Sequence, residues 1–449
     1  MIKAYKSYTN SGIHWVGDIP ANWSKVKIGR SFDLIASGTT PKSGSRVYYS
    51  EGTINWLNTG DLNDSYITKT KKKITQKALE DFSTLKLYPE ESIVIALYGA
   101  TIGKLGHLKI KTTTNQACCV LSNSKLINNG FLFYFLLYSR EHIISMAYGG
   151  GQPNISQDTI KQLYLPKPPL QVQTQIAKYL DYQTNIIDQL IEKKEKLVTL
   201  LQEQRQAIIN EAVTKGLDPN AKVKDSGIEW LGEIPEAWEI YSLKHFCSQM
   251  ISGPFGSSLK KEFYVKSGYK IYGQEQVIKN DFSYGDYYID ENRFQQLRRC
   301  EISTGDVLIS CVGTFGKIAL VPKNFEKGII NPRLVKITPD SQKVIPKFLL
   351  ILLRSKLTYS QLESLNRGGV MGVINLGILS KLKFPISSLL EQNKIIDHID
   401  SMTHYIDLSL EKIVLQIQKL KEYRQSIISE AVTGKIDLRE WEAPKSAIA

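Results

Sequence analysis

The sequence contains few of the side chains that build metal or redox sites. Among 449 residues there are five cysteines and six histidines. No two cysteines are spaced as Cys-x-x-Cys, and no histidine lies at the spacing of a zinc-ligand partner. We therefore predict no metal site and a set of reduced, buried thiols of the kind found in cytosolic proteins, namely Cys118, Cys119, Cys247, Cys300 and Cys311.

Long hydrophobic runs are also missing. The two longest, 131–138 and 348–353, are far shorter than the roughly 20 residues that a membrane-spanning helix needs. Residues 1–10 lack the apolar core of a signal peptide. We expect both runs to form buried helices, and the protein to lie in the cytoplasm without membrane contact.

Motifs of known catalysts are absent as well. The sequence has no HExxH and no GxSxG, and no Asn-Pro-Pro-aromatic or Asp-Pro-Pro-aromatic motif for methylating a base. The segment 99–104 looks like a phosphate-binding loop, but its glycines are too closely spaced and Leu105 follows where Ser or Thr is needed. We predict that the chain is not an enzyme and binds no cofactor itself.

An excess of positive charge is present instead. The chain has 57 Lys and Arg against 44 Asp and Glu, a net charge of +13. This excess favours a polyanionic partner, with nucleic acid first and an anionic membrane surface second. The length suits two or three domains of ordinary globular composition.

Two segments of the chain occur twice. Residues 11–23 return as 226–238, an offset of 226 − 11 = 215, and residues 205–214 return as 424–433, an offset of 219. The two offsets differ by only four residues, which indicates a tandem duplication. The parts between, 24–150 and 239–367, share little. This pattern suits a constant frame that presents two different readers, although simple drift of duplicated domains would also produce it.

Each repeat ends in a long heptad pattern. Apolar residues alternate by four and three from position 176, and again 219 positions later. Because the first helix leaves the first domain and the second must return, we expect an antiparallel pair with a pseudo-two-fold axis, and the N-terminus close to residue 433. The alternative is that each helix packs on its own domain as ordinary core. The predicted seam comprises Ile176, Leu180, Ile187, Leu190, Leu197, Leu201 and Ile208, then Ile395, Ile399, Ile406, Ile413, Leu420 and Ile427.

The variable parts mix short strand-like runs, such as 91–98 and 305–312, with polar turns. Lys and Arg on loops can neutralise phosphates, and Arg, Gln and Asn can read base edges. Any one of these residues could equally be solvated surface. The candidate DNA contacts are Thr40, Lys42, Ser43, Arg46, Lys69, Lys71, Lys72, Lys73, Tyr98, Lys104 and Gln152 in the first part, and Ser257, Ser258, Lys260, Lys261, Gln274, Arg293, Arg298, Arg299, Lys317, Arg333 and Arg367 in the second.

Several segments together resemble the specificity subunit of type I restriction–modification systems. The approach to the second helix, at Leu389-Leu390, lacks the proline-rich stretch that is usual there, and His14 and Asp18 replace the usual Glu. The resemblance nevertheless covers essentially the whole chain. The segments that carry it are 11–23 and 226–238, 37–41, 251–259, 165–173, and 384–385 with 391–392.

The resemblance implies an α+β fold in which a long antiparallel two-helix coiled coil separates two mixed α/β target recognition domains. The expected boundaries are 1–168 and 215–385 for the recognition domains, 169–214 and 386–434 for the helices, and 435–449 for a C-terminal tail.

The resemblance further implies that each domain reads half of a split, asymmetric site in double-stranded DNA and that the helices set the gap. Two methylation subunits would use S-adenosylmethionine to methylate adenine N6, and two restriction subunits would use ATP and Mg. The alternatives are an interaction scaffold that binds no DNA, and the specificity part of a related restriction system.

Overall fold

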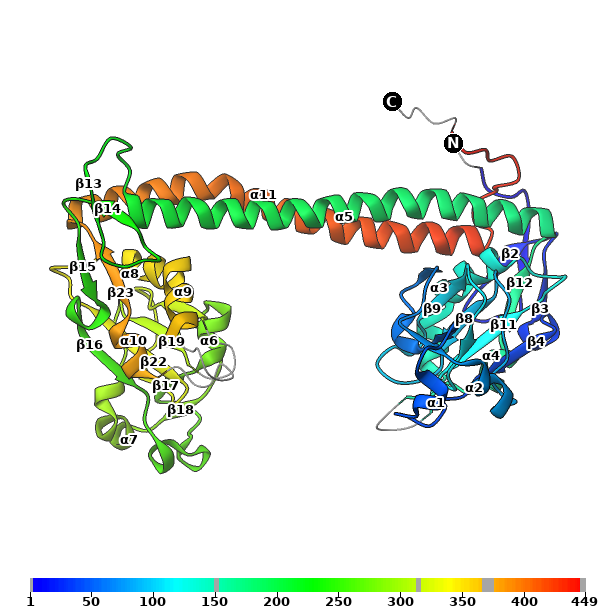
Figure 1. The fold of residues 1–449 in the computed structure, drawn as a ribbon. Coiled ribbons are helices and arrows are strands. Elements are labelled where there is room, and N and C mark those ends of the chain that lie inside the picture. The colour runs from blue at the N-terminus through cyan, green and yellow to red at the C-terminus, as the bar shows by residue number, and fades with distance from the viewer. Residues whose placement is uncertain (1–2, 149–152, 312–315, 366–374, 445–449) are drawn as a thin grey trace. The chain divides into compact units, whose positions relative to one another are not determined.

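The computed structural model describes residues 3–148, 153–311, 316–365 and 375–444. The chain forms two compact units, which are described one at a time. Unit 1 comprises Met1–Glu195 with Leu415–Ala449, and unit 2 comprises Lys196–Val414. Figure 1 shows that both units mix helices and strands.

The centre of unit 1 is a five-stranded sheet in the order β4-β11-β8-β9-β6. Neighbouring strands are antiparallel except for the parallel pair β6–β9. All residues of β8, β9 and β11 are buried, as expected for a sheet covered on both faces. The strands are β4 (Leu34–Ser37), β6 (Ser65–Ile67), β8 (Ile93–Ala96), β9 (Leu105–Leu108) and β11 (Cys118–Ser122).

Helix α3 (Asn129–Ser145) packs on β8 and β9 of this sheet (Figure 1). The Asn128 side chain accepts a hydrogen bond from the Phe131 backbone N–H at 3.1 Å, which caps the start of the helix. The helix contains the apolar run 131–138, whose first seven residues are buried. The expectation of a buried helix there is confirmed.

The remaining short elements of unit 1 surround the sheet. The parallel pair β10–β5 joins β7 in a three-stranded sheet, and two antiparallel pairs, β1–β2 and β3–β12, complete the strands. These elements are β1 (Tyr8–Asn10), β2 (Asp18–Pro20), β3 (Ser24–Lys27), α1 (Arg46–Tyr49), β5 (Ile54–Leu57), β7 (Lys72–Ile74), α2 (Gln76–Asp81), β10 (Thr113–Thr114), α4 (Gln157–Gln162) and β12 (Tyr164–Lys167).

Unit 2 repeats the same plan. A four-stranded antiparallel sheet has the order β16-β22-β19-β20, and a three-stranded sheet has the order β18-β17-β21 with β17 and β21 parallel. The sheets comprise β16 (Cys247–Ser252), β17 (Tyr269–Tyr272), β18 (Tyr288–Ile289), β19 (Val307–Ser310), β20 (Ile318–Leu320), β21 (Gly328–Ile330) and β22 (Leu334–Pro339).

The duplication therefore extends into the parts whose sequences differ. In unit 1, Cys119 lies opposite both Ser37 and Ile95, and in unit 2, Val335 lies opposite both Ser252 and Ile309. The other elements of unit 2 are β13 (Val223–Asp225), β14 (Glu233–Pro235), β15 (Glu239–Ser242), α6 (Gln274–Lys279), α7 (Glu291–Gln296), α8 (Pro346–Arg354), α9 (Lys356–Leu365), α10 (Leu376–Lys381) and β23 (Lys383–Ile386).

Two long helices complete the chain. Helix α5 (Leu170–Lys215) begins in unit 1 and ends in unit 2, and α11 (Leu389–Val432) begins in unit 2 and ends in unit 1. Within unit 1, Arg424 Nε donates to Asp188 Oδ1 at 2.8 Å and Lys194 Nζ donates to Gln416 Oε1 at 2.7 Å. Residue numbers rise on one helix as they fall on the other, so the predicted antiparallel pairing is confirmed there.

Two of the helix-to-helix ion pairs are copies of one another. Within unit 2, Arg205 Nε donates to Asp407 Oδ1 at 2.7 Å, and the second guanidinium nitrogen lies 3.2 Å from Oδ2. Adding 219 to Arg205 gives Arg424, and adding it to Asp188 gives Asp407. The same two-pronged contact therefore occurs once in each unit, as expected of a tandem duplication.

The predicted seam consists of two rows of residues along each helix. The row through positions 180, 187, 201 and 208 is buried or half-buried as predicted, but the row through 176, 190 and 197 is wrong at its last two positions. Leu190 and Leu197 are 42% and 43% exposed, whereas Ile191 is 9% exposed. The row that faces inward has buried residues at positions 184 and 191 and a half-buried one at 198, instead of 183, 190 and 197. This is a shift of one residue, or about 100° around the helix. Of the other predicted seam residues, Leu201, Ile208 and Leu420 are half-buried, and the buried ones are Ile176, Leu180, Ile187, Ile395, Ile399, Ile406, Ile413 and Ile427.

The N-terminal segment lies against the end of α11. The Tyr8 hydroxyl donates to the Gly434 carbonyl at 3.1 Å, and Lys435 Nζ donates to the Asp18 carbonyl at 3.0 Å. The Trp441 ring then packs edge-on against Tyr179 of α5, with ring centroids 5.2 Å apart. The expectation that the N-terminus approaches residue 433 is confirmed.

The cysteines are free thiols, and four of the five are buried. Burial raises the pKa of Cys119 and of Cys247 to about 12 and that of Cys311 to about 11. Such groups remain protonated near neutral pH and are poor nucleophiles. Within the described ranges, no three His, Cys, Asp or Glu side chains are grouped so as to hold a metal ion. In those ranges, none of the helices is both long and apolar enough to cross a membrane.

Candidate nucleic-acid interface

In unit 1, several predicted DNA contacts meet at one end of the central sheet. Strands β4 and β8 end where β9 and β11 begin, because Ser37 pairs with Cys119 and Ile95 pairs with Leu105. The side chains that follow β4 and β8, or precede β9 and β11, therefore share one edge. We call this group sheet end 1; its members are Thr40, Tyr98, Lys104 and Gln116.

Close packing and hydrogen bonds fix the backbone of sheet end 1. A side chain at Gly38 would overlap the Thr114 carbonyl oxygen, so the turn after β4 needs a glycine. The Gly38 N–H donates to Thr114 Oγ1 at 3.1 Å. The Thr40 hydroxyl donates to Gln116 Oε1 at 2.6 Å, and both side chains are exposed. The amide of Gln116 is thus held in one orientation at the surface.

Lys104 lies at the end of the glycine-rich segment 99–104. Gly99 and Gly103 have positive φ values of 84° and 75°, and the Gly103 N–H donates to the Ala96 carbonyl at 2.9 Å. The segment is therefore a tight turn between β8 and β9, and not a phosphate-binding loop before a helix. Its lysine is exposed, and an exposed lysine can form an ion pair with a phosphate group.

Unit 2 has an equivalent edge. A side chain at Gly253 would overlap the Asn331 carbonyl oxygen, just as a side chain at Gly38 would overlap the Thr114 carbonyl oxygen in unit 1. Gln274, which follows β17, donates through Nε2 to Ser310 Oγ at 2.6 Å at the end of β19. Arg333 precedes β22 and is exposed, and Asn331 Oδ1 accepts a hydrogen bond from its backbone N–H at 2.9 Å. We call Gln274, Lys317 and Arg333 sheet end 2.

The other predicted contacts of unit 1 lie elsewhere on its surface. Lys72 and Lys73 are on β7, opposite Trp56 and Asn55, and are exposed. Lys71 Nζ donates to the Gly60 carbonyl at 3.0 Å. The exposed side chains of Lys42, Ser43, Arg46 and Lys69 lie on or beside the turns that follow β4 and β6.

Several predicted contacts of unit 2 have partners within the protein. Lys260 pairs with Glu262 at 3.4 Å and Arg298 with Glu301 at 3.8 Å. The Arg293 guanidinium lies 3.8 Å from the ring centre of Phe263. Of the rest, Lys261, Ser258 and Arg299 lie in short 3-10 turns. Gln152, Arg367 and the side chain of Ser257 lie outside the described residues.

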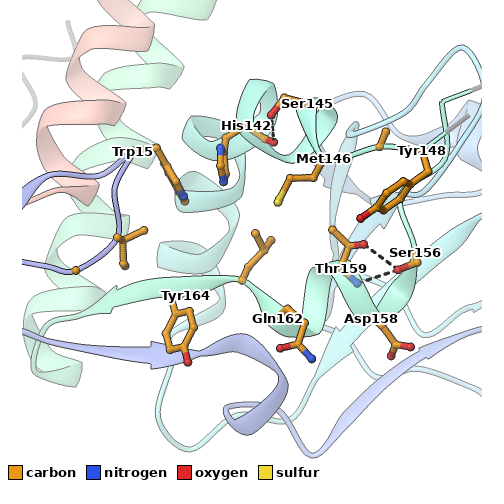
Figure 2. Close-up of a pocket in the computed structure, with 14 residues that line it drawn as sticks. Trp15, His142, Ser145, Met146, Tyr148, Ser156, Asp158, Thr159, Gln162 and Tyr164 are labelled. Atoms are coloured by element: carbon orange, nitrogen blue, oxygen red, sulfur yellow. Dashed lines mark hydrogen bonds between the residues drawn. The ribbon is translucent and has the colours of Figure 1, made fainter. Parts of the chain in front are cut away.

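A pocket of about 690 Å³ lies in unit 1 (Figure 2). The Trp15 ring stacks on His142 at 4.6 Å between ring centroids, and burial lowers the pKa of this histidine. Ile155, which directly precedes the pocket's Ser156, lies beside sheet end 1, because its N–H donates to the Leu97 carbonyl at 2.8 Å. This pocket was not predicted from the sequence.

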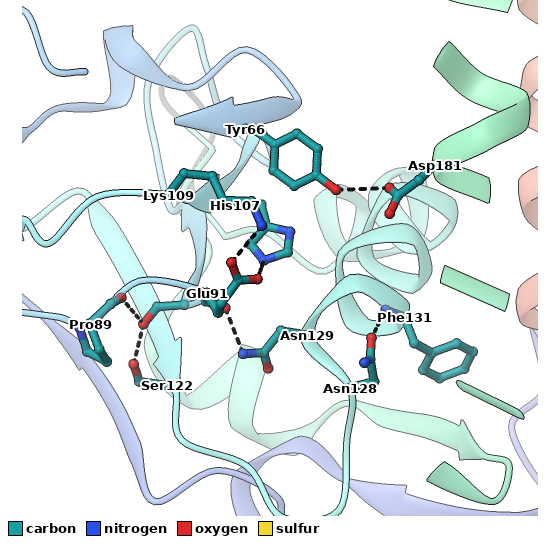
Figure 3. Close-up of polar contacts among 11 residues, drawn as sticks. Tyr66, Pro89, Glu91, His107, Lys109, Ser122, Asn128, Asn129, Phe131 and Asp181 are labelled. Carbon is teal, nitrogen blue, oxygen red and sulfur yellow. Dashed lines mark hydrogen bonds and ion pairs between the residues drawn. The ribbon is translucent and has the colours of Figure 1, made fainter. Parts of the chain in front are cut away.

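A polar network joins the sheet of unit 1 to α5 (Figure 3). Asp181 Oδ1 accepts hydrogen bonds from the hydroxyls of Tyr134 at 2.8 Å and Tyr66 at 3.1 Å. Burial, together with this carboxylate, raises the pKa of both tyrosines. Beside Tyr66, His107 Nε2 lies 2.8 Å from Glu91 Oε2. Burial lowers the pKa of His107 although Glu91 opposes the shift.

A buried glutamine fastens the start of each long helix. Gln173 Nε2 donates to the carbonyls of Leu126 and Pro168, and its Oε1 accepts from the Asn128 N–H at 2.8 Å. In unit 2, Gln392, 219 residues later, makes the same three bonds with Lys343, Ser387 and Ile345. Both side chains are 0% exposed. These bonds attach each long helix to the domain of its own unit.

Comparison with known proteins gives one consistent family. A family model described as the type I restriction modification DNA specificity domain matches residues 20–200 and 235–419. The chain is 25% identical to the type I restriction enzyme MjaVIII specificity subunit of Methanocaldococcus jannaschii, over 94% of each chain. It is 23% identical to the EcoBI specificity subunit of Escherichia coli, over 80% of this chain and 76% of the relative.

A solved structure shares the fold. Its title concerns complex assembly and conformational transition of the type I R-M system, and it matches with a TM-score of 0.69 at 16% identity. The match covers 93% of this chain and 99% of that chain. The tandem α+β architecture with its long helices is therefore an established fold.

Proposed function

Since the chain belongs to the type I restriction–modification DNA specificity family, we propose that it binds double-stranded DNA and that each unit reads one half of a split, asymmetric site. The part of each unit outside α5 and α11 is called its reading domain. Sheet end 1 and sheet end 2 are the proposed reading surfaces. The reaction itself takes place on partner subunits in the cytoplasm.

The observation that carries this proposal is the pair of equivalent sheet ends with different side chains. Both edges rest on a glycine packed against a carbonyl group. Sheet end 1 presents Gln116 and Lys104, whereas sheet end 2 presents Gln274 and Arg333. Glutamine pairs with adenine and arginine with guanine in the major groove. Two similar frames with unlike polar groups suit two unlike half-sites.

The exposed apolar side chains of the long helices support a second part of the proposal, the binding of methylation subunits. Soluble proteins rarely leave such rows uncovered, and helices pack through apolar faces of this kind. Leu190 and Leu197, which are absent from the buried seam, belong to this group. Its members are Ile186, Leu190, Leu415 and Tyr423 in unit 1, and Leu197, Leu200, Met402, Tyr405, Leu408 and Val414 in unit 2.

We propose that one methylation subunit binds the helical face of each unit. These subunits would bring S-adenosylmethionine and methylate adenine N6, which requires the base to leave the stack. Two restriction subunits would bring ATP and Mg. In this arrangement α5, which at 1.5 Å per residue is about 70 Å long, sets the gap between the half-sites.

Removing Lys104 of sheet end 1 together with Lys42, an exposed lysine on the turn that follows β4, tests the DNA-binding proposal. For the double variant Lys42→Ala and Lys104→Ala, we expect weaker binding and a salt dependence reduced by about one unit of slope per lost phosphate contact. The measurement is fluorescence anisotropy of a labelled duplex with the assembled complex, over a range of salt concentrations. The control is Lys193→Ala, an exposed lysine on α5. Binding by the native complex that does not respond to salt would contradict the proposal.

A further inference from the structure

A short motif near the start of each long helix occurs twice. Leu180-Asp181 with Thr184 returns as Ile399-Asp400 with Thr403, at the same offset of 219. In both copies the threonine hydroxyl donates to the carbonyl four residues earlier, at 2.7 Å in α5 and 2.8 Å in α11. The aspartate of each copy turns instead to the reading domain of its own unit.

In unit 1, Asp181 contacts two layers of the reading domain at once. The hydroxyl of Tyr134 comes from α3. The hydroxyl of Tyr66 comes from β6 at the edge of the central sheet (Figure 3). Tyr134 is 4% exposed and also lies 3.1 Å from Thr184 Oγ1. Asp181 thus accepts hydrogen bonds from hydroxyls on two different elements. These two bonds together fix how α5 is rotated relative to α3 and β6.

In unit 2 the equivalent carboxylate has a different partner. Asp400 forms an ion pair with Lys347, which lies in the first turn of α8. Helix α8 begins three residues after Lys343, whose carbonyl group accepts a hydrogen bond from Gln392. Each long helix is therefore attached to its domain at two levels, by a buried glutamine and, eight residues later, by an aspartate. The glutamine contacts are the same in both units, but the aspartate contacts are not.

We propose that Asp181 and Asp400 are positioning residues that set the angle at which each reading domain joins its helix, and thereby the gap between the half-sites that the complex accepts. Neither residue would touch DNA. This inference rests on the proposed function, because it assumes that the two units read separate half-sites. A small change in the angle between helix and reading domain produces a larger displacement at the far end of the domain. Such a change should therefore alter the accepted gap more than the half-site sequences.

The test measures methylation of a set of duplexes by the complex of this chain with its methylation subunits. The duplexes carry the native half-sites separated by the native gap, by one base pair less and by one base pair more. We expect Asp181→Ala and Tyr134→Phe to reduce the preference for the native gap by roughly tenfold. Asp181→Asn, whose amide oxygen still accepts a hydroxyl, should fall between these variants and the native chain.

The Tyr134→Phe variant keeps the buried ring and removes only the hydroxyl, so it decides the question if Asp181→Ala fails to fold. Glu192→Ala, an exposed carboxylate on the same helix, should leave the preference unchanged. Lys347→Ala, which removes the partner of Asp400 in unit 2, should reduce the preference for the native gap as Asp181→Ala does in unit 1.

An equal loss of methylation on the duplexes with all three gaps would overturn the inference, because it would indicate that these residues have a structural role alone. An unchanged preference in folded variants would overturn it too. If the native complex itself shows no gap preference, the proposed function fails first.

Discussion

Replacing Gln392 by alanine is expected to destabilise unit 2 by about 3 kcal/mol, because a buried polar group without a partner costs about 1–3 kcal/mol. The change leaves the carbonyls of Lys343 and Ser387 and the N–H of Ile345 without the bonds that the side chain supplies. Urea denaturation gives the change in the free energy of unfolding. Hydrogen exchange then locates the loss, since the amide of Ile345 should lose its protection first.

The matched control is Gln418→Ala on the same helix. The Gln418 side chain is exposed and donates a hydrogen bond to Glu422, one turn away. Its loss should change the free energy of unfolding by less than about 0.5 kcal/mol. Gln173→Ala should affect unit 1 as Gln392→Ala affects unit 2, because the three bonds are the same. Equal effects of Gln392→Ala and Gln418→Ala would contradict the anchoring role.

The second large effect concerns the helices. Inserting seven residues after Glu195 and seven after Val414 should lengthen both helices by about 10 Å and keep their seam in register. At 3.4 Å per base pair, the preferred gap should grow by about three base pairs, while the half-sites stay the same. The measurement is methylation of duplexes with the native gap and with the longer gap.

A seven-residue insertion after Asn220, in the exposed loop that follows α5, serves as the control and should leave the gap unchanged. If the lengthened chain still prefers the native gap, the helices do not set the spacing.

The frame of the molecule could be predicted because its signals are local or repeated. The duplication and the two long helices follow from segments that match at fixed offsets. The predicted seam was wrong at positions 190 and 197, because leucines there satisfy a heptad as well as Ile191 and Val198 do. Apolar pattern alone does not distinguish a face that packs on the partner helix from one that stays exposed.

The sheet ends could not be predicted, because they depend on strand order. Gln116 lies beside Thr40 only because β11 inserts between β4 and β8. No spacing in the sequence indicates this neighbour, and Gln116 was missed. Conversely, Lys260 and Arg298 look like phosphate contacts in the sequence, yet acidic neighbours pair with them in the fold. A basic cluster is informative only once its own counter-ions are known.

The most direct measurement is a map of methylated adenines in the genome of cells that express this chain with its methylation subunits. Two unlike reading domains on one frame predict a motif of two different halves separated by a fixed number of unspecified base pairs. Arg333→Ala should alter one half and leave the other intact. A continuous or palindromic motif, or a motif in which Arg333→Ala changes both halves, would contradict the account.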